Sequence, residues 1–222
     1  MSRATQTTAA PFVPDKRILP VLRDAVQQCR GCDLYRNATQ AVFGEIEAAN
    51  NKKSSRINIM MVGEQPGDRE DREGHPFVGP AGKLLDACLQ EAEIDRRTVY
   101  VTNTVKHFKW EPRGKLRLHK KPSMQEIHAC RPWLDAEIET VQPKLIVCLG
   151  ATAAQGLLGA KFRITQSHGE IQEQPGLPPI IATLHPSAIL RAPSPEDREQ
   201  SRQTLIDHLR HAVIFTSRTH PK

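Results

Sequence analysis

Residues 57–67 read INIMMVGEQPG, an apolar run that ends in a loop rich in glycine and proline. Three later stretches have the same apolar character: TVYVTNTV at 98–105, KLIVCLG at 144–150 and PIIATLHP at 179–186. Each run is continuously apolar rather than alternating, which is typical of strands buried on both faces of a parallel sheet. Segments with helical spacing separate the runs. We therefore predict an α/β fold, a three-layer α/β/α sandwich around a central, mainly parallel four-stranded sheet.

The predicted helices occupy the segments between these strands. Residues 123–141 begin with Ser123 and Glu126 at the spacing of a capping box, which marks a helix N-terminus. Residues 195–215 complete the fold as a final helix.

The chain has 222 residues, enough for one domain with a substantial core. We expect a single domain over residues 15–216, preceded by a flexible N-terminal tail at 1–14 and containing a polar loop at 47–56. A basic loop insertion at 107–122 and a small hairpin at 162–174 are expected within this domain.

Composition excludes a membrane-spanning protein. Hydrophobic residues make up 38% and charged residues 25% of the chain, as in globular proteins. No apolar run approaches the roughly 20 residues that a membrane helix needs, and the N-terminus lacks the apolar segment of a secretory signal. We therefore expect a cytoplasmic monomer. Thiols stay reduced in that compartment, so the five cysteines are expected as metal ligands or core residues rather than disulfides.

Positive charge gathers around one histidine. The formal net charge is +6, and the segment from Lys109 to Lys121 holds six Lys or Arg against one acid, Glu111. Such a segment favours a polyanionic partner, and a solvated basic loop is the alternative. His119 lies in the middle of this segment, where it either contacts phosphate or takes part in chemistry.

Polar side chains follow three of the predicted strands. Glu64, Gln65 and Asp68 come after the first strand. Asn103 lies near the end of the second strand, and His185 near the end of the fourth. Ligands of parallel sheets bind beyond the carboxyl ends of the strands, so we expect the functional groups to collect at this edge.

Two further features fit a flat, base-like ligand. Phe77 stands in a loop rich in glycine and proline, where it serves either as a stacking platform or as a loop anchor. Ile189 and Leu190, next to Arg191, fit an apolar wedge that enters a base stack. A lone histidine at a strand end, such as His185, is more often structural than catalytic.

Four sequence segments resemble one enzyme family. They are GEQPG at 63–67, GHPFVGPAGKLL at 74–85, YVTNTVK at 100–106 and HPSAIL at 185–190. In this order they resemble the uracil-DNA glycosylase superfamily, especially its iron–sulfur branch, family 4. The likeness runs from about Cys29 to the final helix. It implies a uracil-DNA glycosylase-like fold and the excision of uracil from DNA.

The resemblance also implies roles for individual residues. Glu64 takes the position of the acidic residue in the catalytic loop, and His185 supports O2 of the departing uracil. Phe77 stacks on the base, and Asn103 reads its edge, because an amide offers the donor and the acceptor that match uracil O4 and N3–H. A carboxylate near the sugar and a donor near O2 oppose the charges that develop during cleavage. The expected substrate-binding residues are Gln65, Asp68, Phe77, Asn103 and Arg117. The expected minor-groove wedge comprises Ser187, Ile189, Leu190 and Arg191.

The resemblance makes Cys29, Cys32 and Cys130 ligands of an iron–sulfur cluster. A [4Fe–4S] cluster takes four ligands, and His107 stands where family 4 has its remaining cysteine, so we expect His107 to complete the set. Cys88 is the competing fourth ligand, and a structural zinc site is the alternative metal centre. The expected role of the cluster is to brace the N-terminal segment and the basic loop.

The basic loop departs from family 4 and resembles the loop of X-type uracil-DNA glycosylases. Lys-Leu-Arg-Leu-His at 115–119 stands where that subfamily has Lys-Arg-Arg-Ile-His, and Gln65 also fits the subfamily. The resemblance implies that His119, rather than water, captures C1′ of the deoxyribose and leaves a covalent protein–DNA adduct. An imidazole held beside the sugar has an effective concentration that free water in a shielded site does not match. Arg117 is expected to position a phosphate or the loop itself.

The expected partner is DNA that contains uracil, with single strands accepted. Its phosphates are expected to meet Lys115, Lys120 and Lys121. Two alternatives stay open: a uracil-DNA glycosylase that turns over, with His119 touching only phosphate, and a non-catalytic DNA-binding module with a structural metal.

Overall fold

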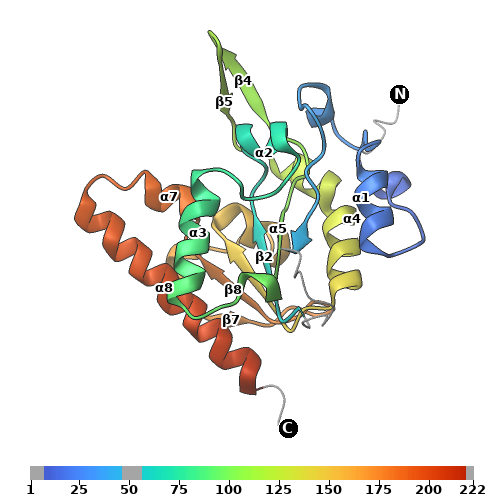
Figure 1. Ribbon diagram of the computed structural model, residues 1–222. Helices are drawn as coiled ribbons and strands as arrows, with labels where there is room; N and C mark the ends of the chain where they lie inside the picture. The colour runs from blue at the N-terminus through green and yellow to red at the C-terminus, as the bar shows by residue number, and fades with distance from the viewer. Residues whose placement is uncertain (1–7, 47–56, 219–222) are drawn as a thin grey trace.

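The structure is a computed structural model that describes residues 8–46 and 57–218. Its centre is a six-stranded sheet with the strand order β1-β3-β2-β6-β8-β7 (Figure 1). The four inner strands are parallel to one another: β2 (Ile59–Gly63), β3 (Val99–Asn103), β6 (Leu145–Leu149) and β8 (Ile180–Thr183). They coincide with the four apolar runs of the sequence, so the predicted parallel core of the sheet is confirmed.

Two short strands at the edges make the sheet six-stranded rather than four-stranded. β1 (Glu45–Ile46) pairs antiparallel with β3, and β7 (Ile171–Gln172) pairs antiparallel with β8. Two residues are too few to display an alternating pattern in the sequence. β7 and the short helix α6 (Ile164–Ser167) occupy the segment at 162–174, so the hairpin predicted there was wrong.

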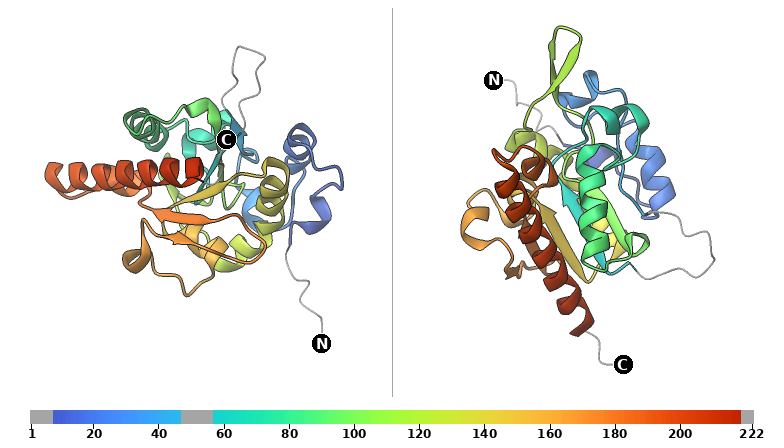
Figure 2. Two further views of the ribbon diagram at one scale, coloured as in Figure 1. Left: turned by 90° about the horizontal axis from the view of Figure 1, so that it is seen from below. Right: turned by 60° about the vertical axis from the view of Figure 1, so that its left-hand side comes forward.

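Helices cover both faces of the sheet, as Figure 2 shows from two further directions. α3 (Pro80–Glu91) and α8 (Pro195–Arg218) pack on one face. α4 (Met124–Val141) and α5 (Ala151–Leu158) pack on the other. The three-layer α/β/α sandwich is therefore confirmed.

The alternation of side chains along each strand explains the two cores. Met61 and Val101 join the cluster under α3 and α8, whereas Met60 and Tyr100 join the cluster under α4 and α5. Successive side chains of a strand point to opposite faces, and here both faces are covered. This double burial is the reason that the strands read as continuous apolar runs.

The N-terminal segment packs against α4. Ala9 is buried, and its N–H donates to the carbonyl of Ala129 with an N···O distance of 2.7 Å. The 3₁₀ turn η1 (Ala10–Phe12) and helix α1 (Leu19–Val26) follow. Within the segment expected as a flexible tail, Ala9, Phe12 and Val13 pack in the cluster against α4, whereas Ala10 and Pro11 are exposed.

Shorter elements connect these parts of the chain. They are η2 (Asp33–Arg36), α2 (Asp68–Glu73), η3 (Arg96–Thr98) and α7 (Pro186–Leu190). No helix in the described ranges is long and apolar enough to cross a membrane. Residues 1–7 of the expected tail and the polar loop expected at 47–56 lie outside the described residues.

The predicted basic loop forms a β-hairpin that projects from the body of the molecule, at the top of Figure 1. β4 (Trp110–Arg113) and β5 (Leu116–His119) pair antiparallel. Their register leaves Gly114 and Lys115 as a two-residue turn, and the positive φ of +60° at Gly114 explains why glycine stands there. His119, which the sequence singled out, is the last residue of β5.

Candidate active site

A cavity of about 530 Å³ opens at the carboxyl ends of the parallel strands. Glu64 follows β2, Asn103 ends β3, and His185 follows β8. The hairpin adds Leu118 and His119 to the lining. The predicted site residues that line the cavity are Glu64, Gln65, Phe77, Asn103, His119, His185, Ser187 and Arg191. The strand ends, the hairpin and the loop that carries Phe77 thus bring together eight of the fifteen residues predicted for catalysis and for binding substrate and DNA.

Glu64 and His119 face each other within this cavity. Oε1 of Glu64 lies 3.3 Å from Nε2 of His119, and Oε2 accepts a hydrogen bond from Oγ1 of Thr152 at 2.5 Å. Burial opposes ionisation of Glu64, but the hydrogen bonds from His119 and Thr152 outweigh it, so the pKa of the carboxyl is lowered. Glu64 is therefore a carboxylate held beside a half-exposed imidazole. Sequence reasoning missed Thr152, although it follows β6 and the argument from strand ends applies to it.

Phe77 and Asn103 lie against the same glycine. A Cβ at Gly63 would lie 2.4 Å from Oδ1 of Asn103 and 2.7 Å from Cζ of Phe77. Any larger residue would therefore displace one of these two side chains. Phe77 also has a φ of +57°, a left-handed conformation that is unfavourable for a bulky residue and that clusters at functional sites. The aromatic ring and the amide are thus fixed close together, which suits the stacking and hydrogen bonding of a flat polar ring.

His185 caps the N-terminus of α7 and stacks on Phe77. Its Nδ1 accepts a hydrogen bond from the backbone N–H of Ser187 at 3.0 Å, so the proton of the neutral ring lies on Nε2. Burial lowers the pKa of His185 to about 4, although Glu64 opposes this shift. The ring centroids of His185 and Phe77 are 6.3 Å apart, with 27° between the ring planes. His185 is thus a neutral donor near neutral pH.

Gln65 holds the base of the hairpin. Its Nε2 donates to the carbonyls of Lys109 at 3.2 Å and Lys120 at 3.0 Å, and its Oε1 accepts from the N–H of Lys109 at 3.0 Å. Lys109 precedes β4 and Lys120 follows β5, so one amide ties the two ends of the hairpin together. Both ends of the Gln65 amide therefore form hydrogen bonds with backbone. Gln65 thus positions the hairpin and also lines the cavity.

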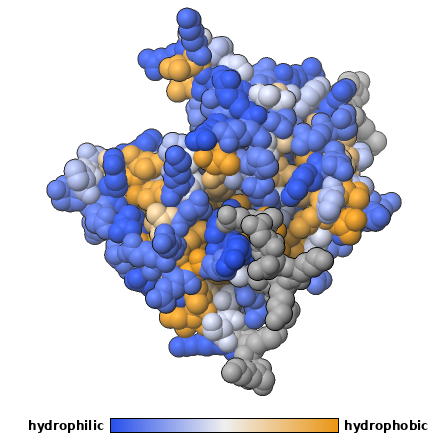
Figure 3. Space-filling model, in the orientation of Figure 1, coloured by the Kyte–Doolittle hydropathy of each residue, from blue (hydrophilic) through white to orange (hydrophobic). Residues whose placement is uncertain are grey.

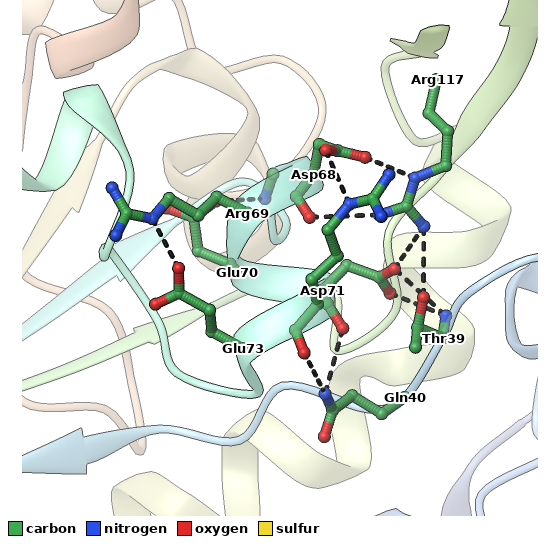
Figure 4. Close-up of polar contacts among 10 residues, drawn as sticks. Thr39, Gln40, Asp68, Arg69, Glu70, Asp71, Glu73 and Arg117 are labelled. Atoms are coloured by element: carbon green, nitrogen blue, oxygen red, sulfur yellow. Dashed lines mark hydrogen bonds and ion pairs between the residues drawn. The ribbon is translucent and has the colours of Figure 1, made fainter. Parts of the chain in front are cut away.

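Arg117 ties the hairpin to α2, as Figure 4 shows. Its guanidinium pairs with Asp68 and Asp71, and Nη1 lies 2.6 Å from Oδ2 of the buried Asp71. It also lies 5.4 Å from the ring centroid of Phe108 and 5.4 Å from that of Trp110. Arg117 and Asp68 are not among the described residues that line the cavity. Of the two roles predicted for Arg117, the contacts favour positioning the loop. Asp68 pairs with Arg117 and with Arg72, and its contact with substrate stays a prediction.

The predicted phosphate contacts on the hairpin differ in their surroundings. Lys115 in the turn and Lys121 beyond β5 are exposed. Nζ of Lys120 instead lies 2.8 Å from a carboxylate oxygen of Glu111 on the opposite strand. Lys115 and Lys121 therefore present the more accessible positive charges.

The segment predicted as a wedge is only partly accessible. Ser187 and Arg191 line the cavity. Ile189 is buried, with 1% of its surface exposed, in the core cluster of α3 and α8, and Leu190 is half-buried. The prediction of Ile189 as an exposed wedge was therefore wrong. The short helix α7 turns Ile189 inward, and neither the residue types nor their spacing revealed that turn.

Three of the predicted metal ligands lie in one apolar cluster between the N-terminal segment and α4. Cys29 and Cys130 are buried there, and Cys32 packs against them. Nε1 of Trp133 donates to Sγ of Cys29 at 3.1 Å, and the N–H of Lys106 donates to Sγ of Cys130 at 3.3 Å. Burial raises the pKa of Cys32 and raises that of Cys130 to about 12, and the neighbouring thiols add to both shifts. This set of thiols and N–H donors suits an iron–sulfur centre.

The two candidates for a fourth ligand lie in different surroundings. His107 is buried and follows Lys106, whose N–H contacts Sγ of Cys130. Burial lowers its pKa to about 4, and the charged group that opposes the shift is Asp71. Cys88 is fully buried in the core cluster of α3 and α8, apart from the other three thiols, and Cys148 is buried in the cluster on the opposite face. Among residues 8–46 and 57–218, no three His, Cys, Asp or Glu side chains are arranged to hold a metal ion. The ligand set therefore stays a prediction.

A buried ion pair that sequence reasoning missed connects the thiols with the cavity. Lys106, whose N–H contacts Cys130, pairs through Nζ with Glu137 and donates to the carbonyl of Asn103 at 2.7 Å. Glu137 also accepts from the hydroxyl of Tyr100 at 2.9 Å. Both charges are fully buried, so each depends on the other for compensation. The sequence contains no local sign of this pair because its members lie in the loop after β3 and on α4.

Comparison with known proteins agrees with this geometry. The family model of the uracil DNA glycosylase superfamily matches residues 52–210. The chain is 37% identical over 184 residues to a type-4 uracil-DNA glycosylase of Thermotoga maritima, an alignment that covers 82% of this chain and 88% of the relative. Type-4 uracil-DNA glycosylases of Sulfurisphaera tokodaii and Archaeoglobus fulgidus are 33% identical over 212 residues and 34% identical over 183 residues. These alignments cover 89% and 79% of this chain, and 89% and 85% of the relatives. The chain therefore belongs to the uracil-DNA glycosylase superfamily.

Proposed function

We propose that this protein excises uracil from DNA and then becomes covalently attached to the product through His119. The observation that carries this proposal is the 3.3 Å approach of His119 Nε2 to Glu64 in a cavity that Phe77, Asn103 and His185 also line. The names of the type-4 relatives support the excision step.

In the first step, the bond between C1′ of the deoxyribose and N1 of uracil breaks, and the electron pair stays on the base. A uracil stacked on Phe77 places its polar edge within reach of the Asn103 amide, which offers both a donor and an acceptor. The neutral His185 donates its Nε2–H to O2, where negative charge develops. The Glu64 carboxylate opposes the positive charge that develops on the sugar.

In the second step, a lone pair of the His119 imidazole forms a bond to C1′. The imidazolium formed in this way sheds its remaining N–H proton. When Nδ1 is the attacking atom, that proton lies on Nε2 and passes to Oε1 of Glu64, 3.3 Å away; when Nε2 attacks, the proton on Nδ1 leaves to solvent. Because the hairpin fixes His119 beside the cavity, its effective concentration at the sugar exceeds that of water. The alkylated imidazole is a poor leaving group, so the protein acts once.

The hairpin and α7 provide the contacts to uracil-containing DNA. Lys115 and Lys121 present exposed ammonium groups to phosphates, and Lys120 joins them when it leaves Glu111. Ser187 and Arg191 contact the backbone beside the flipped nucleotide. We propose that single-stranded DNA is accepted, because its uracil is already free of pairing.

The cysteine cluster would hold one [4Fe–4S] cluster through Cys29, Cys32 and Cys130, with His107 as the fourth ligand. When bound, such a cluster supplies a stable cross-link between segments that are distant in the sequence. Here it would join the N-terminal segment to α4 and to the backbone of Lys106, next to the loop that leads into the hairpin.

A denaturing gel tests the proposal. Purified protein is incubated with a labelled oligonucleotide that contains one uracil, and the mixture is heated in SDS. We expect a shifted band that survives this treatment, together with released uracil. The His119→Ser variant should release uracil without forming the band. Released uracil with no shifted band from the unaltered protein would instead support the enzyme that turns over, and binding without release would support the non-catalytic module.

A further inference from the structure

The hairpin displays apolar side chains in water. Among the described residues, the exposed large hydrophobic side chains are Ile18, Leu116, Leu118 and Ile214. Leu116 is the most exposed of these at 71%, and Leu118 is 43% exposed. Figure 3 shows orange side chains on the projecting hairpin, surrounded by hydrophilic ones. Leucines that point into solvent on a projecting strand indicate a partner that covers them.

The two leucines share one face of β5. Side chains of a strand alternate, so Leu116 and Leu118 point to one side while Arg117 and His119 point to the other. The Arg117 side is fastened to α2 through Asp68 and Asp71, which leaves the leucine side without such an anchor. Leu118 also lines the cavity next to His119. The apolar face of the hairpin is therefore continuous with the site that receives the nucleotide.

The positively charged side chains around these leucines indicate a partner that carries negative charge. Arg113 and Lys115 are exposed at the tip of the hairpin, and Lys121 is exposed beyond β5. Cations that flank a small apolar face match the two parts of a DNA strand, because phosphates bind the cations and bases contact the apolar side chains.

The burial of Ile189 leaves the half-buried Leu190 as the more accessible apolar side chain of the segment predicted as the wedge, and directs attention to the more exposed Leu118. Flipping a nucleotide out of duplex DNA costs the stacking and pairing of its base, and an apolar side chain inserted into the vacated stack offsets part of that cost. Ile189, in the segment predicted to provide this side chain, is committed to the core. On the described surface beside the cavity, Leu118 is the exposed large apolar side chain.

We propose that Leu118, backed by Leu116, forms the wedge that enters the base stack of duplex DNA next to the flipped uracil. This proposal rests on the proposed glycosylase function. The hairpin then has two roles, because it carries His119 and also holds open the duplex from which the nucleotide has left. The leucine side of β5 thus contacts bases, while the opposite side carries the nucleophile.

The test compares uracil release from duplex and single-stranded DNA of the same sequence, under single-turnover conditions. The variants are Leu116→Ala, Leu118→Ala and the double variant, and Ile214→Ala on α8 is the matched control for loss of an exposed leucine-sized side chain. We expect the ratio of duplex rate to single-strand rate to fall about tenfold in the double variant, because a single strand has no stack to hold open. Leu116→Ala alone should release uracil from single-stranded DNA at a rate within about twofold of that of the unaltered protein, since truncating an exposed side chain changes stability little.

A fluorescent base analogue placed next to a non-cleavable uracil analogue in the duplex reports unstacking directly. The unaltered protein should raise its fluorescence, and the double leucine variant should not. Equal losses on duplex and single strands, or no loss on either, would overturn the wedge. Concentration-dependent self-association that vanishes in the double variant while the duplex rate is kept would also overturn it and assign the face to a second copy. Absence of uracil release from both substrates by the unaltered protein would instead reject the proposed function.

Discussion

Oε1 of Glu64 and Nε2 of His119 lie 3.3 Å apart, although one residue follows an inner strand of the sheet and the other ends a strand of the projecting hairpin. The carboxylate and the imidazole therefore meet because the base of the hairpin lies beside the carboxyl ends of the parallel strands. Two proposed roles meet at this contact: Glu64 would oppose positive charge at the sugar, and His119 would bond to it.

Glu64→Gln should slow uracil release about a hundredfold, because it keeps the shape of the side chain but removes the charge that stabilises the transition state. The measurement is single-turnover release of labelled uracil. Glu111→Gln is the matched control. Glu111 lies on the hairpin that carries His119, but it pairs with Lys120 outside the cavity. Unchanged release in Glu64→Gln would remove Glu64 from the cleavage step.

Arg117→Gln should reduce adduct formation more than uracil release, because it detaches the hairpin from α2 without altering Phe77, Asn103 or His185. The buried Asp71 also loses its charged partner and keeps only the backbone N–H of Thr39 among these two contacts, so the melting temperature should fall. Both reactions are measured on one sample, by denaturing gel and by uracil release. Arg113→Gln at the exposed hairpin tip is the control. Equal losses of adduct formation and uracil release would show that Arg117 is needed for cleavage in the cavity as well as for positioning the hairpin.

Gly63→Ala should nearly abolish uracil release, because the added methyl group collides with Oδ1 of Asn103 and with the Phe77 ring. The collision displaces the groups that bind the base while the buried strand itself can persist. Release kinetics and a circular dichroism spectrum are the measurements, and the spectrum should be kept. Full activity in this variant would mean that the two side chains work from other positions.

Uracil release should show no titration near pH 6.5. The pKa of His185 is about 4 and that of Glu64 is lowered, so both groups keep their working forms as pH falls from 8 to about 5, and release should decline toward pH 4. The pH profile is measured in the unaltered protein by counting released uracil in a single turnover, because His119→Ser would remove one of the hydrogen bonds that lower the pKa of Glu64. A break near pH 6.5 in uracil release would assign control to a histidine other than His185.

Protein purified without oxygen should contain about four iron atoms per chain and absorb in the visible region. Cys32→Ser and Cys130→Ser should lose both iron and absorbance, whereas Cys88→Ser and Cys148→Ala, in the two sheet cores, should keep them. Iron analysis of His107→Ala then tests the fourth ligand. Zinc in place of iron would overturn the cluster.

The sequence predicted the elements whose signals are local. The four inner strands were readable because burial on both faces makes them continuously apolar, and the helix that starts at Ser123 was readable because its capping box is encoded within four positions. The edge strands β1 and β7 were not, since each has only two residues. The hairpin had a signal in Gly114, which was outweighed by the density of charge around it.

Within the site, sequence reasoning found the side chains that stand at strand ends but not the contacts between distant segments. The inward turn of Ile189, the clamp of Gln65 on the hairpin and the pairing of Lys106 with Glu137 all depend on how elements pack. Such contacts are set by tertiary structure, and no spacing rule within one segment encodes them.

Gln65 fastens both ends of the hairpin, and Arg117 fastens its second strand to α2. In the proposed capture step, the conformational freedom that His119 must lose to reach the sugar is therefore lost when the protein folds, not when it reacts. The capture step should accordingly have a small activation entropy, so that its rate depends on temperature almost entirely through the enthalpy of bond formation. Loosening either fastening should leave that enthalpy unchanged and make the activation entropy more negative.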